Sequence, residues 1–333
     1  MLGATAVVLL GSPTPPLRWP LRKTPPALAP IANRAVVAHQ VDALHRLGFE
    51  RVAVAGDEAE ADRVQGALAS AGVDPESILY LSLGAISGRI PLAPAASLLS
   101  ADAPLVLLES AVVPGPDLAE VIAQVVDDPA RSAVVALQTG DDIGPKVRML
   151  AAVIGRPALL ALAEADPSVV FSSGGIRETL RNEGLHLLEW AASRSWLNIE
   201  RAENLLDANR ALLDLVASGD SRAFAQRNDV HGAVILDETA TLDYSTVRGP
   251  AIIGAGAFIA DSYIGPYTSI GDGVVIEASE IESSIICSNA IIRDLGVRVQ
   301  DSVIGSGTVT THDPQLPHAL RVMVGEDARI SLS

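Results

Sequence analysis

The sequence predicts an α/β domain with a mixed, mainly parallel, Rossmann-like sheet, followed by a parallel β-helix of hexapeptide repeats. Two observations predict this fold class. In the first two thirds of the 333 residues, short apolar segments alternate with segments of helical periodicity, which is typical of β–α–β units. In the last third the helical periodicity stops, and an aliphatic residue recurs at about every sixth position. We therefore expect two domains, residues 1–222 and 223–333.

The first domain is predicted from apolar runs and helical spacing, taken in chain order. Residues 35–47 have apolar side chains three and four apart, and Gly48 stands where a helix-ending glycine belongs. The run 105–108 is entirely aliphatic, as expected for a strand that is buried on both faces. The same criteria predict strands at 7–10, 51–56, 78–83, 105–108 and 132–137, and helices at 35–47, 62–71, 118–126, 159–165 and 202–216.

The second domain is predicted from its repeat. Ile253, Ile264 and Ile270 are each followed by glycine, and further aliphatic residues continue as far as Ile304. In a β-helix coil each of three flat faces contributes an inward aliphatic residue, and a small residue allows a tight corner. An ordinary β-sandwich, which is the alternative, would show longer strands with alternating apolar and polar residues.

The composition excludes several classes of protein. Lys and Arg number 24 against 40 Asp and Glu, so the net charge is −16, which argues against binding to nucleic acid or to an anionic membrane surface. Cys287 is the only cysteine, which excludes an intrachain disulfide and a cysteine-based metal site. The first apolar run is too short to span a bilayer and lacks a basic leader, so we expect a cytoplasmic protein. Of the basic residues only Lys23 and Lys146 are lysines.

Several segments carry a resemblance to a known family; they are 30–33, 44–57, 196–199, 203–213, 245–254, 261–272 and the tail segment 316–321. These segments resemble the long-form glucose-1-phosphate thymidylyltransferases, which are sugar nucleotidyltransferases with a C-terminal left-handed β-helix. The resemblance implies the transfer of a nucleotidyl group from a nucleoside triphosphate to a sugar 1-phosphate, with release of pyrophosphate. That chemistry needs a glycine-rich phosphate loop, basic residues, and Mg²⁺ held by aspartates.

The loop that would bind phosphates departs from the family's pattern. The family has Gly-Gly-x-Gly-Thr-Arg here, whereas this chain keeps Gly11 and Ser12 and then runs into prolines. Prolines have no N–H to offer to an anion, so Gly11 and Ser12 are the candidates that remain for nucleotide binding. Arg18 is the candidate for the catalytic role of the family's arginine. The family's Pro-Lys pair is replaced by Pro25 and Pro26, which removes its lysine.

The metal-binding and sugar-binding positions are also changed. The resemblance places the metal ligands at Glu109, where the family has Gly-Asp after a buried strand, and at Asn198, where it has the aspartate of Trp-Leu-Asp. Glu109 keeps a carboxylate for Mg²⁺, whereas Asn198 offers only a neutral amide. In 138–157 we find no Glu-Lys-Pro motif and no Gly-x-Tyr strand, so we interpret this segment as shortened. Lys146 is its one candidate for a catalytic lysine.

Two interpretations follow from these substitutions. In the first, the chain keeps the fold of a nucleotidyltransferase, has lost most of its turnover, and serves as a regulatory, sensing or assembly subunit. In the second, it is a divergent active enzyme that makes a nucleotide-sugar, with Glu109, Arg18 and Lys146 in an altered geometry and Mg²⁺ as cofactor. Both imply a nucleotide or sugar-phosphate ligand. We also expect a homo-oligomer, or a hetero-oligomer with an active paralogue, because the ends of a β-helix are exposed.

Overall fold

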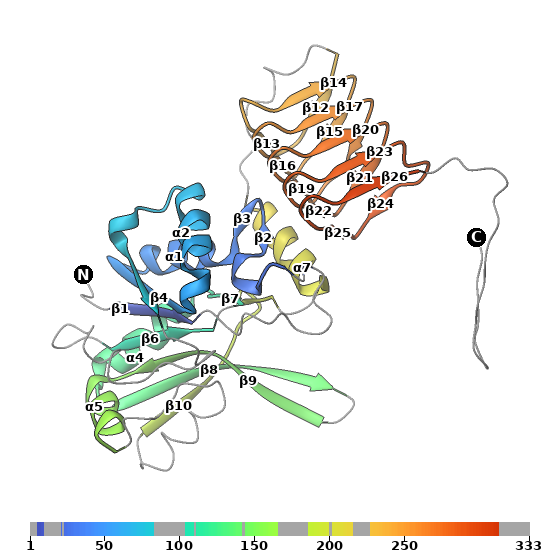
Figure 1. The fold of residues 1–333 in the computed structure, drawn as a ribbon. Helices are drawn as coiled ribbons and strands as arrows, with labels where there is room; N and C mark the ends of the chain where they lie inside the picture. The colour runs from blue at the N-terminus through green and yellow to red at the C-terminus, as the bar shows by residue number, and fades with distance from the viewer. Residues whose placement is uncertain are drawn as a thin grey trace, which may run out of the picture.

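The structure is a computed structural model that describes residues 5–9, 21, 23–82, 104–109, 111–141, 144–165, 186–199, 202–215 and 227–312. It contains an α/β half and a β-helix, and helix α7 (Ala202–Leu213) lies between the two (Figure 1). The first strand of the β-helix is β12 (Asp229–His231), and the predicted domain boundary at 222/223 falls outside the described residues. Among the described residues, no helix is both long enough and apolar enough to cross a membrane.

The α/β half is built on a seven-stranded mixed sheet with the order β10-β8-β9-β6-β1-β4-β5. The neighbours β6-β1-β4-β5 are parallel, as predicted. The strands are β1 (Thr5–Leu9), β4 (Arg51–Gly56), β5 (Ile78–Ser82), β6 (Leu105–Leu108), β8 (Arg131–Asp141), β9 (Gly144–Ile154) and β10 (His186–Ala191). The helices are α1 (Val36–Arg46), α2 (Ala61–Ser70), α4 (Leu118–Asp127) and α5 (Arg156–Ala165).

The structure differs from the sequence prediction in the segment 138–157, where no strand is predicted. This segment completes β8 and forms β9, and the two strands make a long antiparallel hairpin. Strand β9 also pairs antiparallel with β6, so it lies inside the sheet. The physical reason is the apolar run Leu150–Ile154, whose residues are all fully buried, as a central strand requires. The extra strand β10, parallel to β8, is also absent from the prediction.

Helix α1 forms where the helical spacing predicts it. Val37, Val41 and Leu44 are fully buried and lie on one face of the helix, where they pack into the main core. The helix is followed by Gly48 at φ +90°, a left-handed backbone that favours glycine and so ends the helix as predicted.

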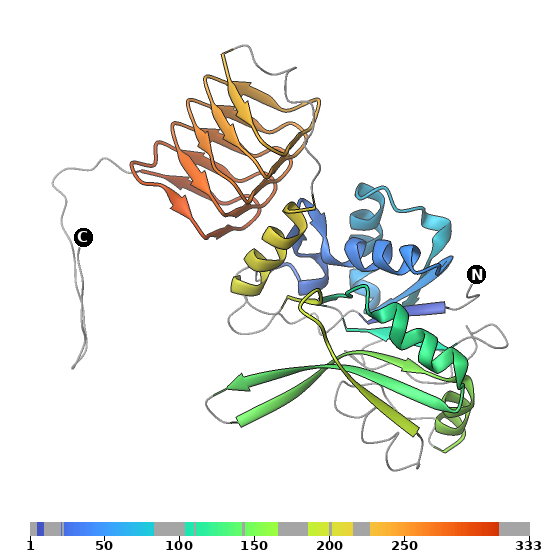
Figure 2. The same cartoon turned by 180° about the vertical axis from the view of Figure 1, so that it is seen from behind.

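The second half coils into a left-handed β-helix of three parallel five-stranded sheets (Figures 1 and 2). The sheets have the orders β12-β15-β18-β21-β24, β13-β16-β19-β22-β25 and β14-β17-β20-β23-β26. The strands after β12 are β13 (Val234–Leu236), β14 (Thr241–Asp243), β15 (Thr246–Arg248), β16 (Ala251–Ile253), β17 (Phe258–Ala260), β18 (Tyr263–Ile264), β19 (Thr268–Ile270), β20 (Val275–Glu277), β21 (Glu280–Glu282), β22 (Ile285–Ile286), β23 (Ile291–Arg293), β24 (Val299–Gln300), β25 (Val303–Ile304) and β26 (Val309–Thr311).

The repeat is less uniform than the predicted step of six. The regular coils pair residues 17 apart, such as Val247 with Ile264 and Ile264 with Ile281. The inward residues therefore follow steps of six, six and five. The short step falls at a two-residue corner that begins with Tyr244 or Asp261, each in the left-handed region of φ. Counted between inward residues, the step across this corner is one residue shorter than the other two steps.

Buried serines support this corner from coil to coil. The Ser245 hydroxyl donates to the carbonyl of Asp243 and accepts from the backbone N–H of Ser262. Ser262 and Ser279 repeat the pattern one and two coils later. Each hydroxyl thus both donates and accepts, which leaves the corner with a continuous, satisfied hydrogen-bond ladder.

The two halves meet at a joint formed by α7, the β2–β3 turn and the third coil. The hairpin of β2 (Pro30–Ile31) and β3 (Arg34–Ala35) turns through Ala32 and Asn33, both at positive φ. Asn209 of α7 accepts from the N–H of Ala32 (2.8 Å) and the hydroxyl of Ser269 (2.7 Å), and its Nδ2 donates to the carbonyl of Tyr267 (3.2 Å). An apolar cluster surrounds these bonds and includes Ile31, Leu205, Ala208, Ile285 and Cys287. Cys287 is buried there and packs as an apolar residue.

We predict that Asn209→Ala weakens the joint. The substitution leaves two buried donors, on Ala32 and Ser269, without their acceptor, which should lower the free energy of unfolding by about 2–4 kcal/mol. Asn209→Asp keeps the acceptor but buries a carboxylate against the carbonyl of Tyr267, so a loss is expected there as well. Urea denaturation measures both. Asn204→Ala on the same helix is the matched control, and an equal loss in that variant would contradict the assignment.

We predict a second effect at the same turn, through His39 of α1. Its Nε2 lies 2.9 Å from the carbonyl oxygen of Ile31. Burial, aided by the charges of Arg34 and Arg46, lowers the pKa of His39 below its ordinary value of 6.5. Protons then bind the unfolded state more readily, so the stability that neutral His39 contributes is present above about pH 6.5 and is lost as the pH falls below it.

The measurement is urea denaturation at about pH 7.5 and about pH 5.5. We expect a smaller loss of stability over this interval in His39→Gln than in the unchanged chain, because the amide can donate to Ile31 without titrating. His312→Gln, at an exposed position, is the control. An unchanged slope in His39→Gln would show that other groups set the pH dependence.

Candidate functional site

The candidate site lies where β6 ends. Glu109 follows Leu108 at the carboxyl end of this buried strand, the edge at which parallel α/β sheets place their ligand sites. The backbone of Glu109 is fixed on two sides. Its N–H donates to the carbonyl of Leu150 in β9 (3.0 Å), and its carbonyl accepts from the Nε2 of Gln40 (2.7 Å). The glutamate backbone is therefore held in place by both the sheet and helix α1.

Gln40 is a functional position that the sequence analysis did not single out. The residue is fully buried on α1, and its Nε2 donates to the carbonyls of both Glu109 and Val112 at 2.7 Å. Its Oε1 is buried and finds no hydrogen-bond partner in the described part of the chain. One signal was available in the sequence. Gln40 lies four residues from both Val36 and Leu44, so it interrupts the apolar face of the helix with a polar group.

Asn198 lies beside the same short segment. Strand β11 (Leu197–Asn198) pairs antiparallel with β7 (Val112–Val113), and Asn198 stands opposite Val112. Since Val112 is three residues after Glu109, the backbones of Glu109 and Asn198 are separated by only about 10–15 Å. The Oδ1 of Asn198 is buried and, within the described residues, has no hydrogen-bond partner.

The segment before Asn198 is anchored to the start of α4. Trp196 donates from Nε1 to the Oδ1 of Asp117 at 2.7 Å, and the hydroxyl of Ser193 donates to the same oxygen at 3.2 Å. A Cβ at Gly115 would lie 2.6 Å from that oxygen, so only glycine leaves room for the contact. These contacts fix β11 against β7 and so fix the position of Asn198.

The other predicted site residues are not placed at this corner. Gly11, Ser12 and Arg18 lie outside the described residues. Lys146 stands on β9 opposite Thr139 in the hairpin. It is four residues before Leu150, so its backbone lies about 13 Å along the strand from the contact with Glu109.

The oxygen ligands that Glu109 and Asn198 offer at this corner can be compared with those that a Mg²⁺ site requires. Mg²⁺ is usually held by one or two carboxylates together with substrate phosphates. Here the two positions supply one carboxylate, on Glu109, and one neutral amide oxygen, on Asn198. Among the described residues, no group of three or more His, Cys, Asp or Glu side chains is arranged so that it could hold a metal ion. The donor set does not match the aspartate pair that the resemblance predicts.

Comparison with known proteins gives relatives of one kind. The chain is 34% identical over 138 residues to a glucose-1-phosphate thymidylyltransferase of Streptomyces griseus, a match to 41% of this chain and 39% of that protein. A protein of the same name from Streptomyces antibioticus is 34% identical over 137 residues, covering 41% of this chain and 38% of that protein. The matched region thus spans about two fifths of the length of these two relatives.

A third relative matches along the whole chain. The low-salt glycan biosynthesis nucleotidyltransferase Agl11 of Haloferax volcanii is 25% identical over 358 aligned positions, which cover 98% of this chain and 99% of that protein. No protein-family model matches the chain. With an α/β half followed by a β-helix, the chain resembles the sugar nucleotidyltransferases, and glucose-1-phosphate thymidylyltransferases in particular.

Proposed function

We propose that this chain is a sugar nucleotidyltransferase-like protein that has lost most of its turnover and acts as a regulatory, sensing or assembly subunit in nucleotide-sugar metabolism. The observation that carries the proposal is Asn198. It stands where the resemblance predicts a metal-binding carboxylate, and it presents a buried, neutral oxygen on the strand that pairs with β7. An amide contributes no charge to offset a triphosphate or a metal ion, so the electrostatic stabilisation of a phosphoryl transition state would be weak.

The two prolines that stand where the family has its Pro-Lys pair support the same proposal. Pro26 is the first residue of the short 3₁₀ helix η1 (Pro26–Leu28), and Pro25 is its N-cap. A proline at the start of such a helix is favourable for folding, because the first N–H has no internal partner. It supplies neither a charge nor an N–H to a phosphate. Lys23, the nearby lysine, is exposed.

The ligand we propose is a nucleotide or sugar phosphate bound without turnover. The relatives are named for glucose 1-phosphate and for glycan biosynthesis, and we extend that chemistry to this chain as a proposal. In that role the corner around β7 binds and positions a ligand by hydrogen bonds, since the amide oxygen of Asn198 there has no donor among the described residues.

A second candidate function is a divergent active transferase. The observation in its favour is Glu109, a carboxylate at the carboxyl edge of β6 whose backbone is fixed by Gln40 and Leu150. In that case Mg²⁺ would be the cofactor, and Arg18 and Lys146 would supply the positive charge.

We predict that pyrophosphate release from thymidine or uridine triphosphate plus glucose 1-phosphate is at least about 10²–10³-fold slower than in an active relative. A coupled pyrophosphate assay with and without Mg²⁺ measures it. In parallel, thermal shift should show stabilisation by a nucleotide-sugar or sugar phosphate that does not require Mg²⁺. Mg²⁺-dependent turnover that is abolished by Glu109→Ala would instead establish the active transferase.

We predict that the β-helix supports assembly. Its end strands, among them β12 and β24, each have only one neighbour among the described strands, and such edges invite pairing with another chain. Light scattering at micromolar concentration should give a mass of at least two chains, either alone or with an active paralogue. A monomer under both conditions contradicts the assembly role and leaves the ligand-binding role to be judged by the thermal-shift experiment.

A further inference from the structure

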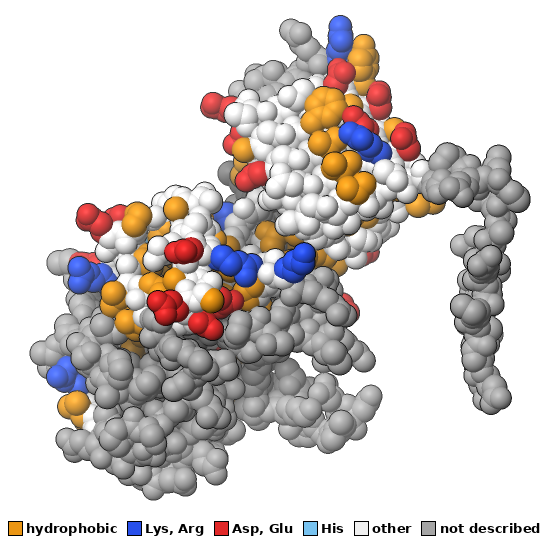
Figure 3. Space-filling model, in the orientation of Figure 1, with side chains coloured by type: hydrophobic (Ala, Val, Ile, Leu, Met, Phe, Trp, Pro, Cys, Tyr) orange, Lys and Arg blue, Asp and Glu red, His pale blue; other side chains and the backbone are white. Residues whose placement is uncertain are grey.

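A concave site lies on one corner of the β-helix, outside the α/β half. Its volume is about 490 Å³. It is lined by the corner and strand residues of successive coils, among them Tyr244, Asp261, Tyr263, Glu280, Val297 and Arg298. Figure 3 shows hydrophobic side chains gathered on a face of the β-helix with basic and acidic side chains beside them. No part of the proposed nucleotidyltransferase-like role uses this site.

The site is made by an insertion in the last coil. At this corner two residues separate Ala260 from Tyr263 at the strand ends, and two separate Glu277 from Glu280. Four residues, 294–297, separate Arg293 from Arg298, which is in register with Glu280. The two additional residues push Val297 out of the coil, where its side chain is 74% exposed. The insertion therefore forms an overhanging wall that the earlier coils do not have.

The floor of the site is rigid before any ligand arrives. It is formed by the serine ladder, in which Ser262 and Ser279 are buried and hydrogen-bonded to the neighbouring coils. The ladder reaches the insertion itself, since the N–H of Leu295 donates to the hydroxyl of Ser279 at 3.3 Å. A preformed floor lowers the entropic cost of binding.

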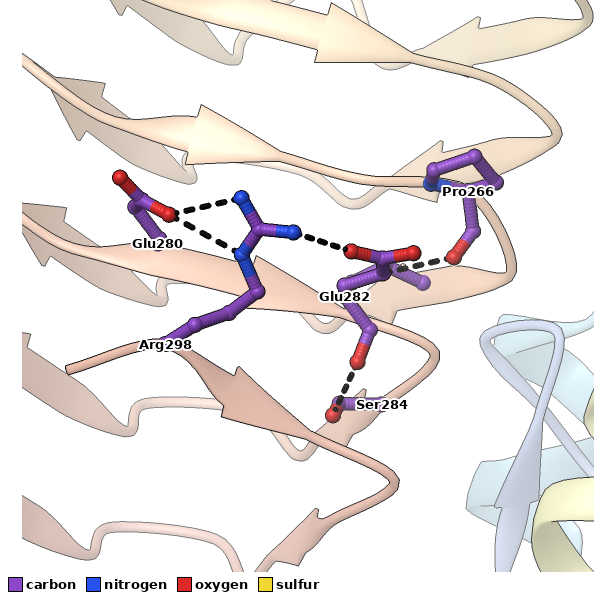
Figure 4. A network of polar contacts seen from close by, with 6 residues as sticks. Pro266, Glu280, Glu282, Ser284 and Arg298 are labelled. Carbon is purple, nitrogen blue, oxygen red and sulfur yellow. Dashed lines mark hydrogen bonds and ion pairs between the residues drawn. The ribbon is translucent and has the colours of Figure 1, made fainter.

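Two tyrosines form the walls of the site, and each is in cation–π contact with an arginine. Arg298 lies over the ring of Tyr263, with its Cζ 5.1 Å from the ring centroid, and Arg227 lies over Tyr244 at 5.4 Å. Arg298 is fixed in turn by Glu280 (2.9 and 3.0 Å) and Glu282 (2.8 Å), as Figure 4 shows. Tyr244 is nevertheless 59% exposed, so one ring face remains open to a ligand.

The polar side-chain groups left unpaired at this corner are acceptors, because the guanidinium of Arg298 is held by Glu280 and Glu282. Asp261 is exposed, and among the described residues its carboxylate has no partner. Glu280 binds Arg298 through one oxygen only, Oε2. The backbone is already used between coils, for example by the N–H of Asp261 bonding the carbonyl of Asp243. Among the described coils, a peptide docked by main-chain hydrogen bonds would therefore find a free edge only at the last strand, β24, and not at the floor of the site.

We propose that this corner binds a neutral saccharide, with one sugar ring stacked on the open face of Tyr244 and covered by Val297. A sugar ring offers an apolar C–H face to the tyrosine and donates its hydroxyls to the carboxylates of Asp261 and Glu280. The same carboxylates repel a pyrophosphate, so the site selects a free glycan over a nucleotide-sugar. The site is thus a second, non-catalytic contact with carbohydrate, separate from the corner around β7.

The test is saturation-transfer NMR of the full chain with neutral trisaccharides (maltotriose, cellotriose, chitotriose) and, in a second arm, with UDP-glucose. We expect binding of at least one trisaccharide with Kd of about 1 mM, and at least about tenfold weaker binding in Tyr244→Ala and in Asp261→Asn. Val309→Ser removes an exposed side chain on another face and is the matched control, with unchanged binding. Thermal melts confirm that all variants fold.

Three outcomes would overturn the proposal. They are no trisaccharide binding, binding that survives both Tyr244→Ala and Asp261→Asn, and binding of a labelled Lys- and Leu-rich peptide at this corner in place of sugar. UDP-glucose that binds equally well to the unchanged chain and to Tyr244→Ala reports on the α/β half, not on this site. A failure of the saccharide proposal can therefore be distinguished from a failure of the proposed regulatory function, which concerns the α/β half.

Discussion

The relation between the two halves depends on one buried amide. Asn209 satisfies three groups that come from three separate segments, the Ala32 N–H, the Ser269 hydroxyl and the Tyr267 carbonyl. Its side chain is only 1% exposed, so water cannot replace a lost bond without entering the joint. The apolar cluster around it supplies most of the contact area, but apolar packing alone tolerates sliding. The directional bonds of this amide fix the register of α7 on the third coil, and the bond from the Nδ2 of Asn33 to the carbonyl of Ile270 supports them.

The same constraint extends to the candidate site. The turn that Asn209 holds leads directly into α1, and His39 bonds back to Ile31 in that turn. The next residue, Gln40, binds the carbonyls of Glu109 and Val112, which define the corner around β7. Hydrogen bonds, together with the backbone of the β2–β3 turn and of α1, therefore connect the β-helix with the end of β6. A ligand or partner that shifts the β-helix has a structural route to that corner, which suits a regulatory or sensing role.

Much of this architecture could be predicted from local sequence. The strands β4 and β6 occur at the predicted residues, and α1 ends within one residue of its predicted end, because apolar spacing and a glycine signal act over a few residues. The insertion at 294–297 and the 17-residue coil were not predicted, since a five-residue step is hidden in a repeat that averages nearly six. Gln40 and Asn209 were missed for a different reason. Their importance lies in bonds to residues 69 and 177 positions away along the chain, which no local pattern encodes.

The two halves treat buried polar groups in opposite ways, and this difference bears on function. In the β-helix the hydroxyls of Ser245, Ser262 and Ser279 each donate and accept, so the coil corner is satisfied by its own chain. Around β7 the Oε1 of Gln40 and the Oδ1 of Asn198 are buried without donors among the described residues. Each such acceptor costs about 1–3 kcal/mol if nothing binds it. The other buried atoms without a partner among the described residues, on His45, Asp117 and Ser132, also lie in the α/β half, so incomplete hydrogen bonding is a property of this half and not of the β-helix. At the corner around β7, the Oδ1 of Asn198 is the acceptor that we propose a hydroxyl-bearing ligand would satisfy without a metal ion.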